Sequence, residues 1–200
     1  MTRSRKYGGD SGQAFPIYIT VVAGLLFLAL AYLAVGQAGA ARNEAQTAAD
    51  AAALAAALEV RDQLAGEWLD SLKDPDAWQD IFDGHVQVAD GCWRAQQLAA
   101  QNDAQVVGCE RTGPLDYRVD VEADEPVGDS IVPGTESTYA KASAKAVIEP
   151  RCDVAPPAEG AGDIELPSLS CGAVDWDLSP DDDPAELPDP EDLFDVHLAD

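Results

Sequence analysis

The chain has 200 residues, four cysteines, two histidines and a formal net charge of −25. So negative a charge argues against nucleic-acid binding, which depends on cationic contacts with phosphate. The sequence has no phosphate-binding glycine loop, and neither His85 nor His197 has a nucleophile at a recognisable spacing. Carboxylates are abundant, but abundance alone does not indicate acid–base chemistry. We therefore expect neither an enzyme nor a bound cofactor.

A long apolar run begins near the N-terminus. Residues Phe15–Gly36 contain no charged side chain, and the alanine-rich stretch Arg42–Ala57 follows without a turn signal. About 20 apolar residues in a helix cover a bilayer core of about 30 Å. Alanine is the strongest helix former, so the helix should continue beyond the lipid. The sequence predicts a transmembrane helix at 15–38 that continues into a helical stalk at 39–73.

The charges around this run predict its orientation. Arg3, Arg5 and Lys6 precede it against Asp10 alone, whereas acidic residues dominate beyond it. Short basic flanks stay in the cytoplasm. We expect a single-pass protein of the cell membrane, with residues 1–14 cytoplasmic and the C-terminal domain extracellular. The alternative is a cleaved secretory signal, but its apolar region is usually only about 7–15 residues long.

The stalk carries small residues that could contact another helix. Gly36 and Ala40 form a small-xxx-small pair, which permits close helix approach. From Val60 to Leu72 an apolar stripe at helical spacing should pack on the protein's own domain. For Ala45–Ala57, contact with neighbouring subunits is nearly as plausible. The candidate assembly face therefore comprises Gly36, Ala40, Ala45, Ala49, Asp50 and Ala53.

A compact outer domain is expected at 74–152, after Pro75 ends the helical pattern. Apolar and polar residues alternate in Leu115–Asp124, as in a half-buried strand. A helix is expected at Cys92–Asp103 and strands at 104–111, 115–124 and 137–150, with a hairpin at Gly113–Pro114. The predicted fold class is α+β: one long N-terminal helix followed by a small antiparallel sheet.

All four cysteines, Cys92, Cys109, Cys152 and Cys171, lie beyond the apolar run, on the side expected to be oxidising. An even set there indicates two disulfides. Three pairings are possible, and we favour Cys92–Cys109 with Cys152–Cys171. A zinc site is the weaker alternative, because no C-x-x-C spacing occurs.

The last segment, 153–200, contains no Lys or Arg. Its high like charge and low apolar content predict a mostly disordered, solubilising tail. It could instead be an acidic arm for a basic partner, and the apolar patch in Leu193–Asp200 could be a docking peptide. Calcium binding is not favoured, since the glycine and closing glutamate of an EF-hand loop are missing.

The segment Gly12–Ala57 resembles the N-terminal region of TadE/TadG-like proteins of the bacterial Flp (Tad) pilus-assembly system. The most specific part is ARNEAQTAADAAALAAA (Ala41–Ala57), with its AADAAALA core around Asp50. The resemblance implies a membrane-bound, minor-pilin-like or pseudopilin-like protein that serves pilus biogenesis or secretion. Its partners would be membrane lipid and other subunits of that apparatus, and its role would not be enzymatic.

The resemblance also implies a candidate prepilin-type cleavage after Gly12. Pilin-like members often carry a glutamate five residues into the mature chain, and here that position is Ile17. Its absence argues against cleavage and favours a TadG-like protein retained in the membrane. An alternative function is that of a membrane-tethered extracellular binding module with an acidic interaction tail. A third possibility is a secreted protein whose apolar N-terminal segment is removed.

Overall fold

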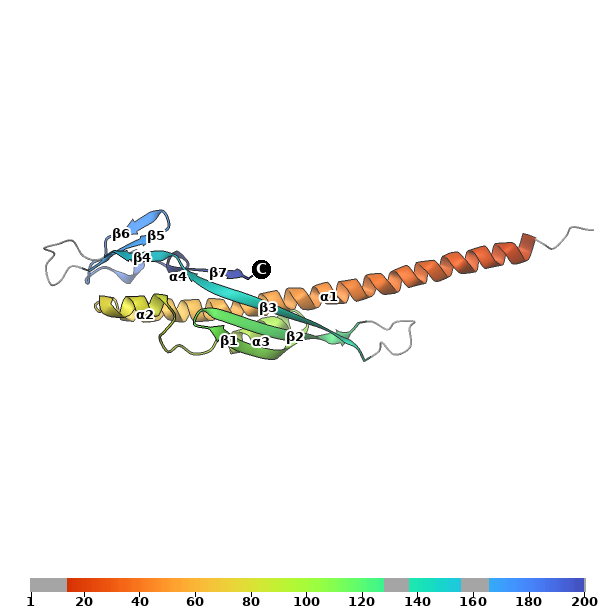
Figure 1. Cartoon of the computed structure of the whole chain (residues 1–200), viewed down its shortest axis with the longest axis horizontal. Coiled ribbons are helices and arrows are strands. Elements are labelled where there is room, and N and C mark those ends of the chain that lie inside the picture. The colour runs from red at the N-terminus through yellow and green to blue at the C-terminus, as the bar shows by residue number, and fades with distance from the viewer. Residues whose placement is uncertain (1–13, 128–136, 156–165, 200) are drawn as a thin grey trace, which may run out of the picture.

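The computed structural model describes residues 14–127, 137–155 and 166–199 (Figure 1). Four α-helices occur in these residues: α1 (Ala14–Asp70), α2 (Trp78–Phe82), α3 (Cys92–Gln101) and α4 (Pro190–Leu193). Two short 3-10 helices are η1 (Pro75–Ala77) and η2 (Pro184–Glu186). The strands are β1 (Ala104–Gly113), β2 (Asp116–Pro126), β3 (Tyr139–Pro150), β4 (Cys152–Ala155), β5 (Ser168–Cys171), β6 (Val174–Trp176) and β7 (Phe194–Leu198).

Helix α1 runs unbroken for 57 residues and confirms the predicted long helix. Its one proline, Pro16, lies in the first turn, where a missing N–H costs no intrahelical hydrogen bond. The helix ends at Asp70, slightly before the predicted end of the stalk, and Pro75 starts η1 after a short turn. In Figure 1 the N-terminal half of α1 projects beyond the strands, whereas its C-terminal half lies along them.

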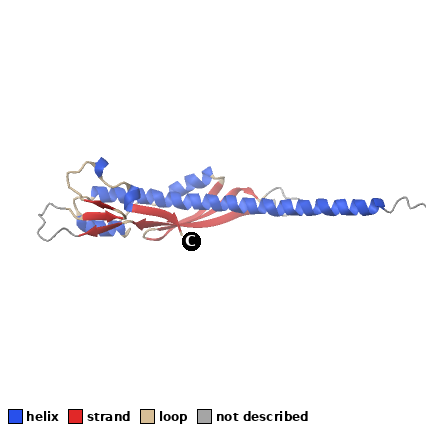
Figure 2. Ribbon diagram, turned by 90° about the horizontal axis from the view of Figure 1, so that it is seen from above, coloured by secondary structure: helices blue, strands red, loops and turns tan. Residues whose placement is uncertain are grey.

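The main sheet has the order β1-β2-β3-β7, and all of its pairs are antiparallel. Three consecutive inward positions of β2, Tyr117, Val119 and Val121, are buried, as the alternating pattern predicted. They oppose Ala146, Ala144 and Ala142 of β3. This face of the sheet packs against α1, and the two layers are seen side by side in Figure 2. The structure confirms the α+β class and the small antiparallel sheet.

Alanine side chains line the part of α1 that the sheet and α3 cover. The buried alanines of this stretch are Ala45, Ala48, Ala49, Ala52, Ala53, Ala55, Ala56 and Ala57. Helix α3 approaches so closely that a Cβ on Gly91 would overlap the carbonyl of Ala56. These small side chains allow α3 and the main sheet to pack closely against two sides of α1, which forms the spine of the domain.

Larger side chains fill the far end of the domain. Val60, Leu64 and Trp68 continue the buried face of α1, and the buried Leu72 follows just after the helix ends, so this stripe packs on its own domain as predicted. The Trp68 and Trp78 rings lie 5.6 Å apart between centroids, and the indole N–H of Trp78 donates to the Ser71 carbonyl at 2.9 Å. The two tryptophans of the core thus lie near the end of α1 that is farther from its projecting half.

Both favoured disulfides are present: Cys92–Cys109 and Cys152–Cys171. The first joins the start of α3 to β1. The second joins β4 to β5, where the two cysteines are direct partners in the small sheet β4-β5-β6.

The tail differs from the prediction of disorder. Of residues 153–200 the structure describes 153–155 and 166–199, and these residues include β5, β6, α4 and β7. Leu193 and Phe194 are buried, and β7 pairs with the C-terminal half of β3. The predicted docking peptide therefore docks on the protein's own sheet. The average composition of the tail does not reveal this docking, because its many acidic side chains lie mostly at the surface while a few apolar side chains reach the core.

Candidate functional site

The projecting half of α1 is apolar on every side. Ala14–Ala41 carries no charge, and at about 1.5 Å per residue it extends for about 40 Å. Its large side chains remain exposed, for example Phe27 at 71% and Tyr32 at 83%. Helices that are apolar all round are buried in protein or in lipid. Within the described residues this helix alone is long and apolar enough to cross a membrane.

The change from this exposed segment to the folded domain takes one helical turn. Arg42, Asn43 and Glu44 are exposed and polar, and Ala45, only 1% exposed, is the first buried residue of α1. No helix break separates the two halves. The same rigid rod therefore serves as the apolar segment and as the spine of the domain.

The structure divides the predicted assembly face. Gly36 and Ala40 are exposed, and a Cβ on Gly36 would meet no atom within 4 Å. Ala45, Ala49 and Ala53 are buried by the protein's own domain, which was one of the two expected contacts, and they present almost no surface to a neighbouring subunit. A stripe of alanines predicts close packing but not the partner, and here the partner is internal.

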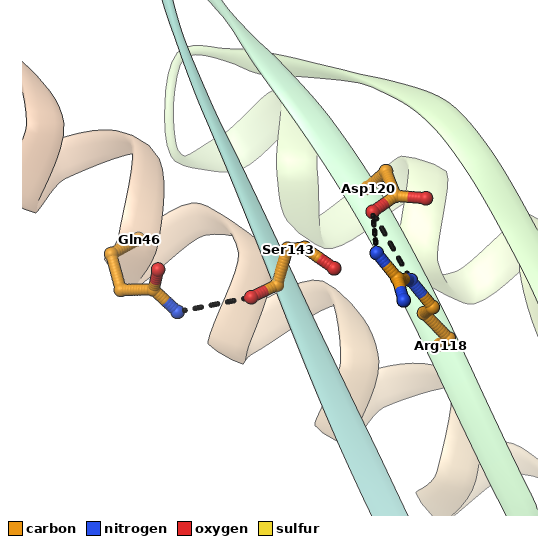
Figure 3. Close-up of polar contacts among 4 residues, drawn as sticks. All are labelled: Gln46, Arg118, Asp120 and Ser143. Carbon is orange, nitrogen blue, oxygen red and sulfur yellow. Dashed lines mark hydrogen bonds and ion pairs between the residues drawn. The ribbon is translucent and has the colours of Figure 1, made fainter.

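Asp50, the last residue of that predicted face, is half-buried at the rim of the domain. Its carboxylate accepts a hydrogen bond from the Gln46 side chain at 2.8 Å. The same Gln46 amide reaches across to the backbone carbonyl of Ser143 on β3 at 3.4 Å (Figure 3). Gln46 was not singled out from the sequence, because its role depends on a contact with a residue 97 positions away.

The outer face of the sheet beside it carries exposed ion pairs. Lys141 pairs with Glu122 at 2.6 Å and Lys145 with Asp116 at 2.9 Å. Arg118 and Asp120 pair at 3.3 Å on β2, as Figure 3 shows. Such surface pairs contribute little stability each, at most about 1 kcal/mol.

Side chains for catalysis or metal binding are not brought together in the described residues. His85 is exposed, and His197 lies 3.2 Å from Asp195 on the surface of β7. The described residues contain no group of three His, Cys, Asp or Glu side chains suited to a metal ion. Gly12, the candidate cleavage position, lies outside the described residues.

One buried tyrosine makes stability depend on pH. Burial raises the pKa of Tyr117 above its usual 10, and Asp90 raises it further, against the opposing effects of Arg111 and the Gly91 backbone. The unfolded chain then loses this proton first, so the stabilising contribution is complete below about pH 10 and is lost as pH rises through the folded pKa. We expect Tyr117→Phe to reduce the alkaline loss of stability, measured as unfolding free energy at pH 8 and pH 11. An equal loss in both proteins would contradict this.

Comparison with known families identifies the N-terminal region. Residues 12–59 match the family described as putative Flp pilus-assembly TadE/G-like. This segment, about a quarter of the chain, is therefore similar to TadE/G-like proteins. No curated protein and no solved structure gives a significant match.

The described part of the TadE/G-like segment lies entirely within α1 and ends before the helix does. This part covers the projecting apolar half of α1 and the alanine-lined stretch that the sheet and α3 enclose. The match supports a component of a pilus-assembly system. The sheet and the distal core lie outside the TadE/G-like segment.

Proposed function

We propose that this protein is a non-enzymatic structural component of a Flp (Tad) pilus-assembly or secretion apparatus, with a minor-pilin-like or pseudopilin-like role. The observation that carries the proposal is the continuity of α1, which joins an apolar segment of membrane length to the core of a folded domain. A continuous helix holds the domain at a set height and tilt relative to its anchor. This geometry suits a subunit whose domain must be positioned accurately relative to the other subunits of an assembly.

In this proposal α1 anchors the protein in the cell membrane with its N-terminus in the cytoplasm. The basic residues Arg3, Arg5 and Lys6 support that direction. The two disulfides support an oxidising location for the domain outside. Membrane lipid is then the solvent of residues 15–38.

Contact with other subunits is proposed at the exposed small residues Gly36 and Ala40. Neither is covered by the described part of the protein, and their spacing permits another helix to approach closely. This is the part of the predicted assembly face that the domain leaves accessible.

A matched pair of variants tests this contact. Gly36→Leu with Ala40→Leu places bulk on the proposed face. Ala34→Leu with Ala38→Leu places the same bulk at the same spacing on the opposite side of α1. Both proteins should remain in the membrane fraction, because leucine favours insertion. Co-purification with other pilus-assembly proteins should fall at least tenfold for the first variant only. Equal behaviour of the two variants would refute the proposed face.

The alternative of a tethered binding module with a free acidic arm has less support. Residues 166–199 contribute β7 and buried apolar side chains to the domain. Deleting the tail would remove part of the core, so such a deletion would test folding before it tested binding. A basic partner for the acidic residues remains a proposal without a supporting contact.

A further inference from the structure

Half of strand β3 has an open edge. On one side β3 pairs with β2 along most of its length. On the other side β7 covers only Ala146–Pro150, and the Ala199 N–H adds one bond to the Lys145 carbonyl at 2.8 Å. Among the described residues, no strand pairs with Tyr139–Ala144 on this side of β3.

The backbone groups that face this edge follow from the alternation of a strand. Successive residues of an antiparallel strand direct their N–H and C=O groups to opposite sides. Because the Lys145 carbonyl bonds on the β7 side, Lys141 and Ser143 direct theirs to the same side. In the described structure the contact made to them there is the long hydrogen bond from Gln46 to Ser143 (Figure 3).

The other edge of the sheet is protected, whereas this one is regular. Strand β1 has irregularities between Val106 and Gly108 and between Arg111 and Gly113. Such bulges twist an edge away from further pairing. The register of β2 with β3 has no shift between Asp116 and Glu122. The register shifts beyond this stretch, between Glu122 and Pro126, so the β3 edge keeps the spacing that another strand requires from Lys141 to Ala144.

The space beside the edge suits an extended chain. A groove of about 680 Å³ reaches this edge, with Gln46 and Asp50 of α1 on one wall, Ser143 and Ala144 of β3 on the other and Leu198 at its end. It also extends over the outer face of the sheet to Arg118 of β2 and Thr112 of β1. A strand placed here would continue the line of β7. Its inward side chains would face small apolar residues, and its outward side chains would lie beside Lys141 and Lys145.

The lysines indicate the charge of the incoming strand. Their neighbours on the paired side are acids, Glu122 beside Lys141 and Asp116 beside Lys145. The segment from Thr138 to Val147 is basic and contains no acid, in a chain of net charge −25. Opposite charges on neighbouring strands stabilise a sheet. An acidic strand on the open side would place carboxylates next to Lys141 and Lys145, so that these lysines would have acidic neighbours on both sides of β3.

We propose that the Tyr139–Ala144 edge of β3 binds an extended, antiparallel strand of another protein in which acidic residues alternate with small apolar ones. A second copy fits less well, because antiparallel pairing of two β3 edges would point the two α1 helices in opposite directions. In Figure 1 β3 and α1 run the same way, so both anchors could not enter one membrane from the same side. This inference does not depend on the proposed pilus role.

A peptide with the sequence of Val119–Asp124 is the probe, since this segment already pairs with β3 on its other side. Added to the full-length protein in detergent micelles, it should slow amide hydrogen exchange at Lys141 and Ser143 at least tenfold. Exchange in the half of β3 covered by β7 should not change. The same peptide with alternate amides N-methylated should have no effect, because it cannot form the ladder.

Two variants at one position separate pairing from folding. Ser143→Pro removes an N–H on the open edge, a position where a sheet tolerates proline, and should weaken peptide binding at least tenfold. Ser143→Ala keeps the N–H and should bind like the wild type. Absence of protection, or equal binding by the N-methylated peptide, would overturn the proposal. Protection that rises with protein concentration without peptide would overturn it in favour of self-association.

Discussion

Replacing Gly91 with alanine should destabilise the domain by about 3 kcal/mol, near the upper end for an overpacked core. The added Cβ would overlap the carbonyl oxygen of Ala56 and lie 2.8 Å from its Cα, so α3 would have to move away from α1. That movement would loosen packing on the alanine-lined stretch and strain the nearby Cys92–Cys109 link. Urea unfolding of the protein in detergent, followed by tryptophan fluorescence, measures the change.

Gly66 provides the matched control for this substitution. It lies within α1, and a Cβ there would meet no atom within 4 Å. Gly66→Ala should therefore stabilise the protein by about 0.5–1 kcal/mol through helix propensity alone. A small effect of Gly91→Ala would show that α3 is not held as closely as the structure indicates.

Two arginines in the middle of the apolar run should prevent stable membrane integration. Leu25 and Leu28 lie near the centre of the uncharged segment, where each arginine costs about 2.5–3.5 kcal/mol for insertion. The double variant Leu25→Arg with Leu28→Arg should move the protein from the carbonate-resistant membrane fraction to the extractable fraction. Western blotting of both fractions measures the distribution.

The control for the anchor places the same charges at its end. Gln37 and Ala41 lie close to the polar residues that start at Arg42, where arginine side chains can reach the interface. Gln37→Arg with Ala41→Arg should leave the protein in the membrane fraction. Loss of membrane association in both variants would indicate that membrane integration depends on the number of added charges and not on their depth in the bilayer.

The parts of the fold that depend on local pattern could be predicted from the sequence. The apolar run and the alanine-rich stretch predict one helix because each residue in them favours the same state. The alternation around Tyr117, Val119 and Val121 predicts a half-buried strand for the same local reason.

Features that depend on distant contacts could not be predicted. Whether Ala49 meets a neighbouring subunit or its own sheet cannot be read from alanine spacing. Strand β7 was missed because the burial of Phe194 depends on distant contacts, among them its pairing opposite Pro150 and its packing on Phe82. The predicted Cys152–Cys171 disulfide did indicate part of this arrangement, since it holds the start of the tail beside the end of β3.

The position of β7 also sets the order in which the domain can fold. The alanine-lined stretch of α1 is made early, yet the strand that completes the sheet beside β3 and α1 spans residues 194–198. The spine therefore stays uncovered until α3, β2 and β3, at residues 92–150, have been synthesised, and its covering is complete only with β7. Alanine exposes little apolar surface during that interval, which limits adhesion to other unfinished chains. A product truncated before β7 would leave more of the β3 edge open, so cellular quality control could distinguish unfinished molecules by their exposed strand.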